Sequence, residues 1–252
     1  MRISTPGRTA VVIDFDNMKE VDKSSTVVGK SGRKKHSFNS FSSQDFNFTQ
    51  VVKRQYNGFK TKTFNFSATI PGTGATLNVE VYIFLENGDF VNGNETTPVS
   101  NGTVKFNIEL KNWEFCNSSS NCKNGEHGEY VDLTISLTSK SRPKRKGDGG
   151  PSPPMRGGKR RQEEYDLGDA VLALSRQVDV DGATKEMPEG YPKLESRGSK
   201  EYFTFRFPKF NGHVFYDPSI TMEEESGSSA VRFGASVAVF LGGLIAAILA
   251  NF

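Results

Sequence analysis

The chain has 252 residues, of which 35% are hydrophobic, so it can bury the core of one large domain or two small ones. Its 32 basic and 29 acidic residues nearly balance at a net charge of +3, which gives no indication of a nucleic-acid partner. Phe and Gly are abundant, at 20 and 25 residues, and long runs of Ala, Leu and Glu are missing. This composition favours strands and turns over helices.

The N-terminal segment contains no apolar run of the length that a secretory signal peptide needs. Its longest run of consecutive apolar side chains, at residues 10–13, is too short. If the protein is exported, we therefore expect either that Met1 is not the native start or that the chain is part of a longer precursor.

Residues 9–18 begin with a β-branched run and predict a strand. Asp14 and Asp16 alternate around Phe15, so both carboxylates are expected on one face of that strand. Calcium takes six to eight oxygen ligands, so two carboxylates make only a weak calcium site. A solvated strand face is the other interpretation, and no cofactor besides this weak calcium is predicted.

Alternating aromatic residues mark the next strands. Phe46 and Phe48, and again Phe64 and Phe66, recur with period two, which predicts one buried face and one polar face. Five asparagines begin Asn-X-Ser/Thr triplets, the acceptor sequence for N-linked glycans in exported proteins. They are Asn47, Asn65, Asn94, Asn101 and Asn117.

Three further strands are predicted at residues 77–85, 104–111 and 131–137, where apolar residues occupy every second position. The aromatic residues that follow the second of these strands are out of phase with it, which predicts a bulge or bend near Asn112.

Two cysteines, Cys116 and Cys122, lie between the last two of these strands. In an exported chain they are expected to pair, so we predict an antiparallel hairpin of residues 104–111 and 131–137 with a disulfide across its loop. Neither a CxxC redox motif nor a structural zinc site fits, because the spacing is wrong and His127 still leaves zinc one ligand short.

Residues 139–162 are rich in Pro, Gly, Lys and Arg and contain almost nothing apolar, which predicts a disordered basic insert. Arg142 to Arg145 resemble the Arg-X-Lys-Arg cleavage site of secretory-pathway proprotein convertases, so Arg145 is a cleavage candidate. Attraction to acidic polymers, glycans or mineral faces is a second interpretation of the insert, and a solvated loop is the third.

Residues 163–222 are expected to complete the same domain as residues 9–138. The strongest signal is at residues 202–210, where Phe203, Phe205 and Phe207 share one face. About 60 residues with one strong strand make a poor independent domain. We therefore predict an all-β fold, an antiparallel β-sandwich ectodomain.

The C-terminal residues 233–250 are apolar or small throughout and predict a hydrophobic helix at the lower length limit for a membrane span. Residues 223–232 form an acidic, small-residue stalk before it. Ser226, Gly227 and Ser228 resemble the attachment site of a glycolipid (GPI) anchor. A transmembrane helix and an anchor signal both remain open, with a buried core helix as the third alternative. Both membrane interpretations place the preceding residues on the outer side.

The sequence carries no strong signal for an enzyme, so a hydrolytic enzyme is the least favoured hypothesis. The three histidines, His36, His127 and His213, lie outside any Ser/His/Asp or HExxH pattern, and no pair of carboxylates is recognisable as a general acid and base.

Three stretches carry a resemblance to a known family: VVIDFDNMKEVDK (residues 11–23), VVGKSGRKKHSFNSFSSQDFNF (27–48) and RFPKFNGHVFYDPSI (206–220). They are similar to the skeletal organic matrix proteins of stony corals, which include the acidic skeletal organic matrix protein and the skeletal aspartic acid-rich proteins. The resemblance spans residues 11–222 and implies an extracellular protein laid down with the calcium carbonate skeleton. This chain differs from the aspartic acid-rich members because it has no long Asp run and its central insert is basic.

The first functional hypothesis is therefore a structural matrix protein, secreted or held at the cell surface. Its expected partners are acidic matrix polymers or glycans and calcium carbonate mineral, with the membrane at the C-terminus. The alternative is a cell-surface adhesion or receptor-like ectodomain with no mineral role.

Overall fold

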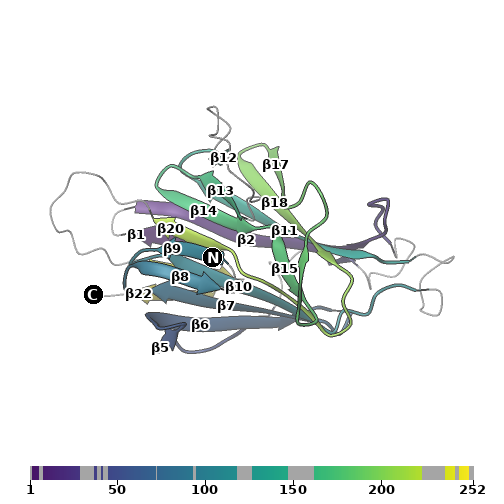
Figure 1. Cartoon of the computed structure of the whole chain (residues 1–252), viewed down its shortest axis with the longest axis horizontal. Coiled ribbons are helices and arrows are strands. Elements are labelled where there is room, and N and C mark those ends of the chain that lie inside the picture. The colour runs from purple at the N-terminus through teal and green to yellow at the C-terminus, as the bar shows by residue number, and fades with distance from the viewer. Residues whose placement is uncertain are drawn as a thin grey trace.

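A computed structural model of the whole chain describes residues 2–5, 8–28, 37–38, 41, 45–71, 73–92, 95–117, 127–146, 162–222, 236–241 and 244–249. Within these ranges the regular elements are strands, every pair of neighbours is antiparallel, and there is no helix (Figure 1). The predicted all-β class is confirmed.

Eight of the described strands form the first sheet. They are β1 (Arg2–Thr5), β2 (Arg8–Val21), β3 (Ser37–Phe38), β11 (Tyr130–Ser139), β17 (Lys193–Arg197), β18 (Lys200–Pro208), β21 (Ser236–Leu241) and β22 (Leu244–Leu249). Their order across the sheet is β17-β18-β11-β2-β1-β21-β22, and β3 also pairs with β2.

Twelve of the described strands form the second sheet. They are β4 (Asn47–Phe48), β5 (Val52–Tyr56), β6 (Phe59–Thr69), β7 (Thr76–Phe84), β10 (Val104–Lys111), β12 (Lys144–Arg145), β13 (Gln162–Asp166), β14 (Ala170–Ser175), β15 (Gln177–Val180), β16 (Ala183–Glu186), β19 (His213–Tyr216) and β20 (Ser219–Met222). Their order is β12-β13-β14-β20-β10-β19-β15-β16. In addition, β7 pairs with both β10 and β6, and β6 also pairs with β4 and β5. A separate hairpin consists of β8 (Gly88–Asn92) and β9 (Glu95–Val99).

One hydrophobic cluster takes side chains from both sheets, such as Leu133 and Phe205 from the first and Val79 and Phe106 from the second. These residues alternate with polar ones along each strand, so each strand turns one face inward. Figure 1 shows β2 and β11 in one layer and β6 and β7 in the other. The cluster includes residues from both sides of the basic insert.

A smaller aromatic cluster covers the outer face of the second sheet. Tyr82, Phe84, Phe90 and Val99 are buried there, so the β8–β9 hairpin packs on the far side of β7. Lys105 lies beside this cluster, with its Nζ 2.7 Å from Oδ2 of Asp217 and 5.1 Å from the centroid of the Phe90 ring.

The predicted hairpin of residues 104–111 and 131–137 is wrong. These residues belong to β10 and β11, which lie in different sheets: β10 pairs with β7, β19 and β20, and β11 pairs with β2 and β18. The predicted bend near Asn112 is confirmed, since its φ of 58° is left-handed. Trp113 and Phe115 after it are buried in the core cluster, so the chain that follows β10 packs against the core.

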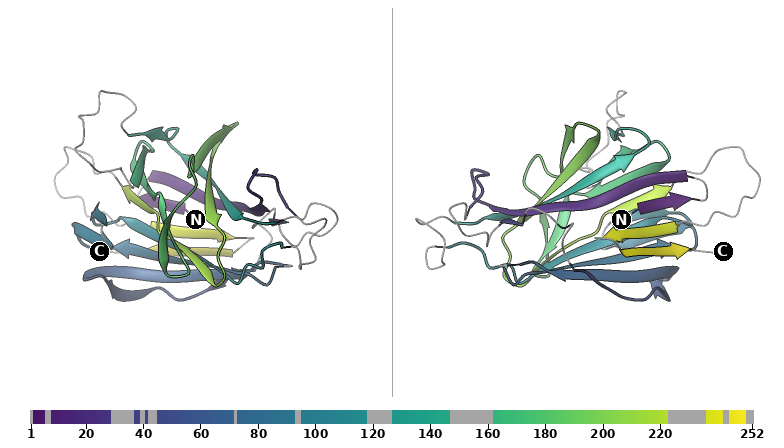
Figure 2. Two further views of the ribbon diagram at one scale, coloured as in Figure 1. Left: turned by 45° about the vertical axis from the view of Figure 1, so that its right-hand side comes forward. Right: turned by 180° about the vertical axis from the view of Figure 1, so that it is seen from behind.

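The C-terminal segment differs from the predicted helix. Residues 236–241 and 244–249 are the strands β21 and β22, which pair with each other, and β21 also pairs with β1 (Figure 2). Strand pairing satisfies the backbone of an apolar segment as a helix does, and a continuous apolar run has no periodicity to separate the two. Nowhere in the described ranges is there a helix with the length and apolar character required to cross a membrane.

The beginning of the basic insert is part of the fold. Ser139 ends β11, and Lys144 and Arg145 form β12, which pairs with Asp166 and Tyr165 of β13. The prediction of disorder therefore fails for residues 139–146, because a partner strand supplies the backbone hydrogen bonds that the sequence alone did not reveal. Residues 147–161 lie outside the described residues.

Candidate functional site

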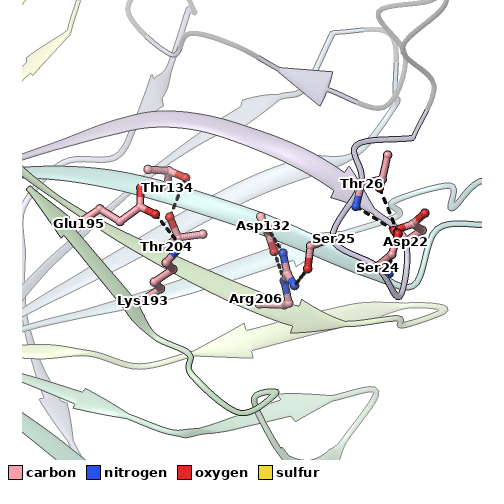
Figure 3. Close-up of polar contacts among 10 residues, drawn as sticks. All are labelled: Asp22, Ser24, Ser25, Thr26, Asp132, Thr134, Lys193, Glu195, Thr204 and Arg206. Atoms are coloured by element: carbon pink, nitrogen blue, oxygen red, sulfur yellow. Dashed lines mark hydrogen bonds and ion pairs between the residues drawn. The ribbon is translucent and has the colours of Figure 1, made fainter. Parts of the chain in front are cut away.

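The outer face of the first sheet carries several groups of polar side chains that contact one another (Figure 3). Alternation along β11 and β18 buries their phenylalanines and aliphatic residues and turns Asp132, Thr134, Thr204 and Arg206 to the other face. The register places Asp132 directly opposite Arg206 and Thr134 opposite Thr204, whose hydroxyls are 3.2 Å apart. The two strands are thus joined by side chains as well as by backbone.

Arg206 is the centre of this face. Its Nε and Nη2 donate to Oδ1 and Oδ2 of Asp132 at 2.7 and 2.6 Å, and its Nη1 donates to Oγ of Ser25 at 2.6 Å. The guanidinium carbon lies 4.3 Å from the ring centroid of Tyr191 and 5.5 Å from that of Tyr130. Burial disfavours the charged form of Arg206 and lowers its pKa. The hydrogen bonds to Asp132 and the negative charge of Asp132 outweigh this effect, so the pKa of Arg206 is raised.

The turn after β2 is fixed to this centre through Ser25. Asp22 Oδ1 accepts hydrogen bonds from the backbone N–H of Ser24 and Thr26, both at 2.8 Å, and from the Ser24 hydroxyl at 2.7 Å. These bonds, first among them the one from the Ser24 hydroxyl, lower the pKa of Asp22. The turn is therefore held together internally by Asp22 and attached to Arg206 by Ser25.

At the edge of the same sheet, β17 presents charges of both signs. Glu195 accepts hydrogen bonds from Lys193 Nζ and Arg197 Nη2, and both pairs are 2.6 Å apart. The bond from Lys193, followed by that from Arg197, lowers the pKa of Glu195. Neither this strand nor the Arg206 centre was predicted as a site. For the Arg206 centre the reason is that Asp132 and Ser25 lie 74 and 181 residues away from it in sequence.

Asp14 and Asp16, the weak calcium candidates, lie on β2 and are both half-buried. A register shift pairs Phe15 with Ile135 and Asn17 with Thr134, so Asp16 is the extra residue of a bulge. Asp14 Oδ2 is 3.8 Å from Nζ of Lys200, and Asp16 Oδ2 accepts a hydrogen bond from Asn17 at 2.7 Å. Within the described ranges no three His, Cys, Asp or Glu side chains gather as a metal site, and calcium binding stays a prediction.

Two of the glycan acceptor triplets lie side by side on β4 and β6. Asn47 is exposed opposite Ser67, and Thr49 Oγ1 accepts a 2.9 Å hydrogen bond from the backbone N–H of Asn65, which is half-buried. Asn101 and Asn117 are exposed, and Asn94 lies outside the described residues. Glycosylation at all five stays a prediction.

Cys116 is buried next to a carboxylate that is also buried. Glu20 accepts hydrogen bonds from the Cys116 backbone N–H at 2.7 Å and from Nε1 of Trp113 at 2.9 Å. These bonds fix the chain after β10 to the end of β2. Cys122 lies outside the described residues, so the disulfide stays a prediction.

The cleavage candidate Arg145 lies on β12, where its Nη2 is 2.8 Å from Oε1 of Glu163. The anchor candidates Ser226, Gly227 and Ser228 lie outside the described residues. Cleavage and anchoring both stay predictions.

Taken together, the described polar side chains on this face of the first sheet form hydrogen bonds and ion pairs with one another. Among the described histidines, His213 has its Nε2 3.8 Å from Oδ1 of Asp179 at the surface.

Comparison with known protein families matches residues 4–250 to acidic skeletal organic matrix protein. The match covers nearly all of the chain, including both sheets and the segments between them. It extends the resemblance carried by the three stretches of sequence. The name of the family assigns its members to the organic matrix of a skeleton, a role in biomineralisation, and the chain belongs to the acidic skeletal organic matrix protein family.

Proposed function

We propose that the chain is an extracellular structural component of the organic matrix of a calcium carbonate skeleton. The single observation that carries the proposal is the family match over residues 4–250. The chain departs from the acidic character in the family name, since its 32 basic residues outnumber its 29 acidic ones. We therefore propose that its main role is to organise acidic matrix molecules and that direct contact with mineral is a secondary role.

The fold supports a scaffolding role. Two facing sheets, which we interpret as a β-sandwich, share one core, and the outer face of the first is cross-linked by Arg206, Asp132 and Ser25. Such a domain keeps its shape when other polymers attach to it. Glycans on Asn47 and Asn101, both exposed, would project away from the core.

The partners we propose are acidic matrix polymers or glycans, and mineral through weakly held calcium at Asp14 and Asp16. The C-terminal apolar segment gives two alternatives for delivery: the protein remains tethered to the membrane of the calcifying cell, or it is shed into the matrix. Neither alternative changes the role of the domain itself.

The test is the location of the native protein. Peptides from the described domain are expected in the matrix that remains when cleaned skeleton is dissolved in acid, and intact-mass analysis of that material would report the glycans, the disulfide, cleavage at Arg145 and the fate of the C-terminus. Recovery from cell membranes alone would instead support an adhesion or receptor role.

A further inference from the structure

Among the strands that the structure describes, the edge of the second sheet at β5 is open. β5 pairs with β6 on one side, and among the described strands no other pairs with it. Four of its five residues are exposed, and β5 lies on the side of β6 away from β7 in Figure 1. An open edge presents unpaired N–H and C=O groups to which another strand can bind.

The pairing pattern identifies which backbone groups face outward. The C=O of Lys60 accepts from the N–H of Leu85 at 3.0 Å, and its N–H donates to Glu86 at 2.8 Å, so both point away from β5. Gln55, opposite Lys60, is therefore in a non-hydrogen-bonded pair. The backbone groups of Gln55, and of Lys53 two residues before it, consequently point to the open edge.

The same hairpin is strongly basic. Residues 52–63 contain Lys53, Arg54, Lys60 and Lys62 and no acidic residue. The side chains of Arg54 and Lys60 are 60% and 74% exposed, and their carboxylate partners Glu80 and Glu86 are 3.6 and 3.9 Å away. Val52, at the start of the edge, is an exposed apolar residue. The edge thus combines free backbone groups with excess positive charge.

We propose that β5 binds an extended acidic polypeptide segment as an added strand. Backbone hydrogen bonds to Lys53 and Gln55 would hold it, and carboxylates at alternate positions, which share one face of the added strand, would lie on the same side of the sheet as Lys53. This names the partner in the proposed function and rests on that function for the choice of an acidic matrix chain.

Two other occupants fit less well. A second copy pairing β5 with β5 antiparallel would bring two Arg54 side chains together, and like charges directly opposite are unfavourable. An acidic polysaccharide matches the charge but lacks the alternating N–H and C=O groups that the edge of a strand requires.

The test measures binding of a fluorescent peptide of alternating Asp and Thr to the full chain at low salt. Lys53→Glu is expected to weaken binding by about tenfold, whereas the matched variant Lys185→Glu, on the exposed edge strand β16, is expected to leave it unchanged. Equal losses in the two variants would reduce the effect to overall charge and overturn the proposal.

A second arm tests the backbone contact. Gln55→Pro removes the outward N–H without removing a hydrogen bond to β6, so the variant is expected to fold and to bind weakly. The same peptide N-methylated at alternate residues keeps its charge but loses backbone donors, so it is expected not to bind the unaltered chain. This measurement still tests the backbone contact if the proline variant does not fold. Undiminished binding of the methylated peptide, or stronger binding of a sulfated polysaccharide, would overturn the added strand.

The outcomes separate this inference from the proposed function. Peptide binding by a protein that is absent from skeleton would support the β5 site and reject the matrix role. A protein that is found in skeleton but does not bind the peptide would support the matrix role and reject the β5 site.

Discussion

Single buried polar residues fix the irregular parts of this chain. Glu20 is fully buried and accepts hydrogen bonds from Trp113 and from the backbone of Cys116. Those two donors lie on the segment that crosses from one sheet to the other, so one carboxylate holds the crossing in place. Buried polar groups are costly when unpaired, which makes this contact sensitive to its neighbours.

Gly128 lies against that carboxylate, and a Cβ added there would be 1.6 Å from Oε1 of Glu20. We expect Gly128→Ala to destabilise the fold by about 2–4 kcal/mol, because Glu20 must leave its donors. Gly190→Ala, where φ is 84° but no atom lies within 4 Å of the new Cβ, is the control, at about 1 kcal/mol. Denaturant unfolding of both variants measures the difference, and equal costs would contradict the steric argument.

Asp181 provides a pH-dependent contact. Its carboxylate accepts hydrogen bonds from the backbone N–H groups of Asn211, Gly212 and His213 at 2.8, 2.8 and 3.0 Å. These bonds, led by the one from Asn211, lower the pKa of Asp181 below its ordinary value of 3.8.

A lowered pKa in the folded state gives stability that is present above pH 3.8 and is lost as the pH falls through the folded value. We expect Asp181→Asn to be less stable than the unaltered chain at pH 7 and to approach it in acid. Asn accepts the left-handed backbone at this turn, so the change isolates the carboxylate. Thermal melts from pH 7 to pH 2 measure it, and a constant difference across that range would contradict the prediction.

Neighbouring strands are held together by side chains on the outer face as well as by the backbone hydrogen bonds between them. The Arg206–Asp132 pair joins β18 to β11 and, through Ser25, holds the turn after β2. The side chains of Arg206 and Asp132 are only 7% and 14% exposed to solvent, so water screens the ion pair weakly.

Arg206→Lys keeps the charge but cannot form the two-pronged contact with Asp132 or stack on Tyr191. We expect a loss of about 1–3 kcal/mol in the free energy of unfolding. Arg197→Lys is the matched control, because its pair with Glu195 is exposed and the expected change is within about 0.5 kcal/mol. A similar loss in both variants would show that the Arg206 pair is no stronger than a surface one.

At the scale of the whole molecule, the described core is built from residues between Ile3 and Ile220. In backbone pairing, the C-terminal hairpin joins the other described strands through β21, which pairs with three residues of β1. Its removal leaves the β1 edge open and leaves the pairing of every other described strand in place.

A chain ending at residue 222 is therefore expected to unfold cooperatively, with a melting temperature lowered by less than about 4 °C, the shift that about 1 kcal/mol produces in a domain of this size. The opened β1 edge is expected to increase self-association. Calorimetry and sedimentation measure both, and loss of the cooperative transition would show that the hairpin is part of the core.

The sequence by itself determined the all-β class, most strands with their buried faces, the bend at Asn112 and the family. These follow from local periodicity and from short stretches of residues, such as the alternating phenylalanines of β18. Only the tertiary structure decided that β10 and β11 lie in different sheets and that Arg206 contacts Asp132 and Ser25. The same holds for the strands at residues 236–241 and 244–249 and for the edge of β5, which is open among the described strands. Period-two patterning states which way a residue points but not which strand lies beside it, because that choice is made by the packing of the whole core.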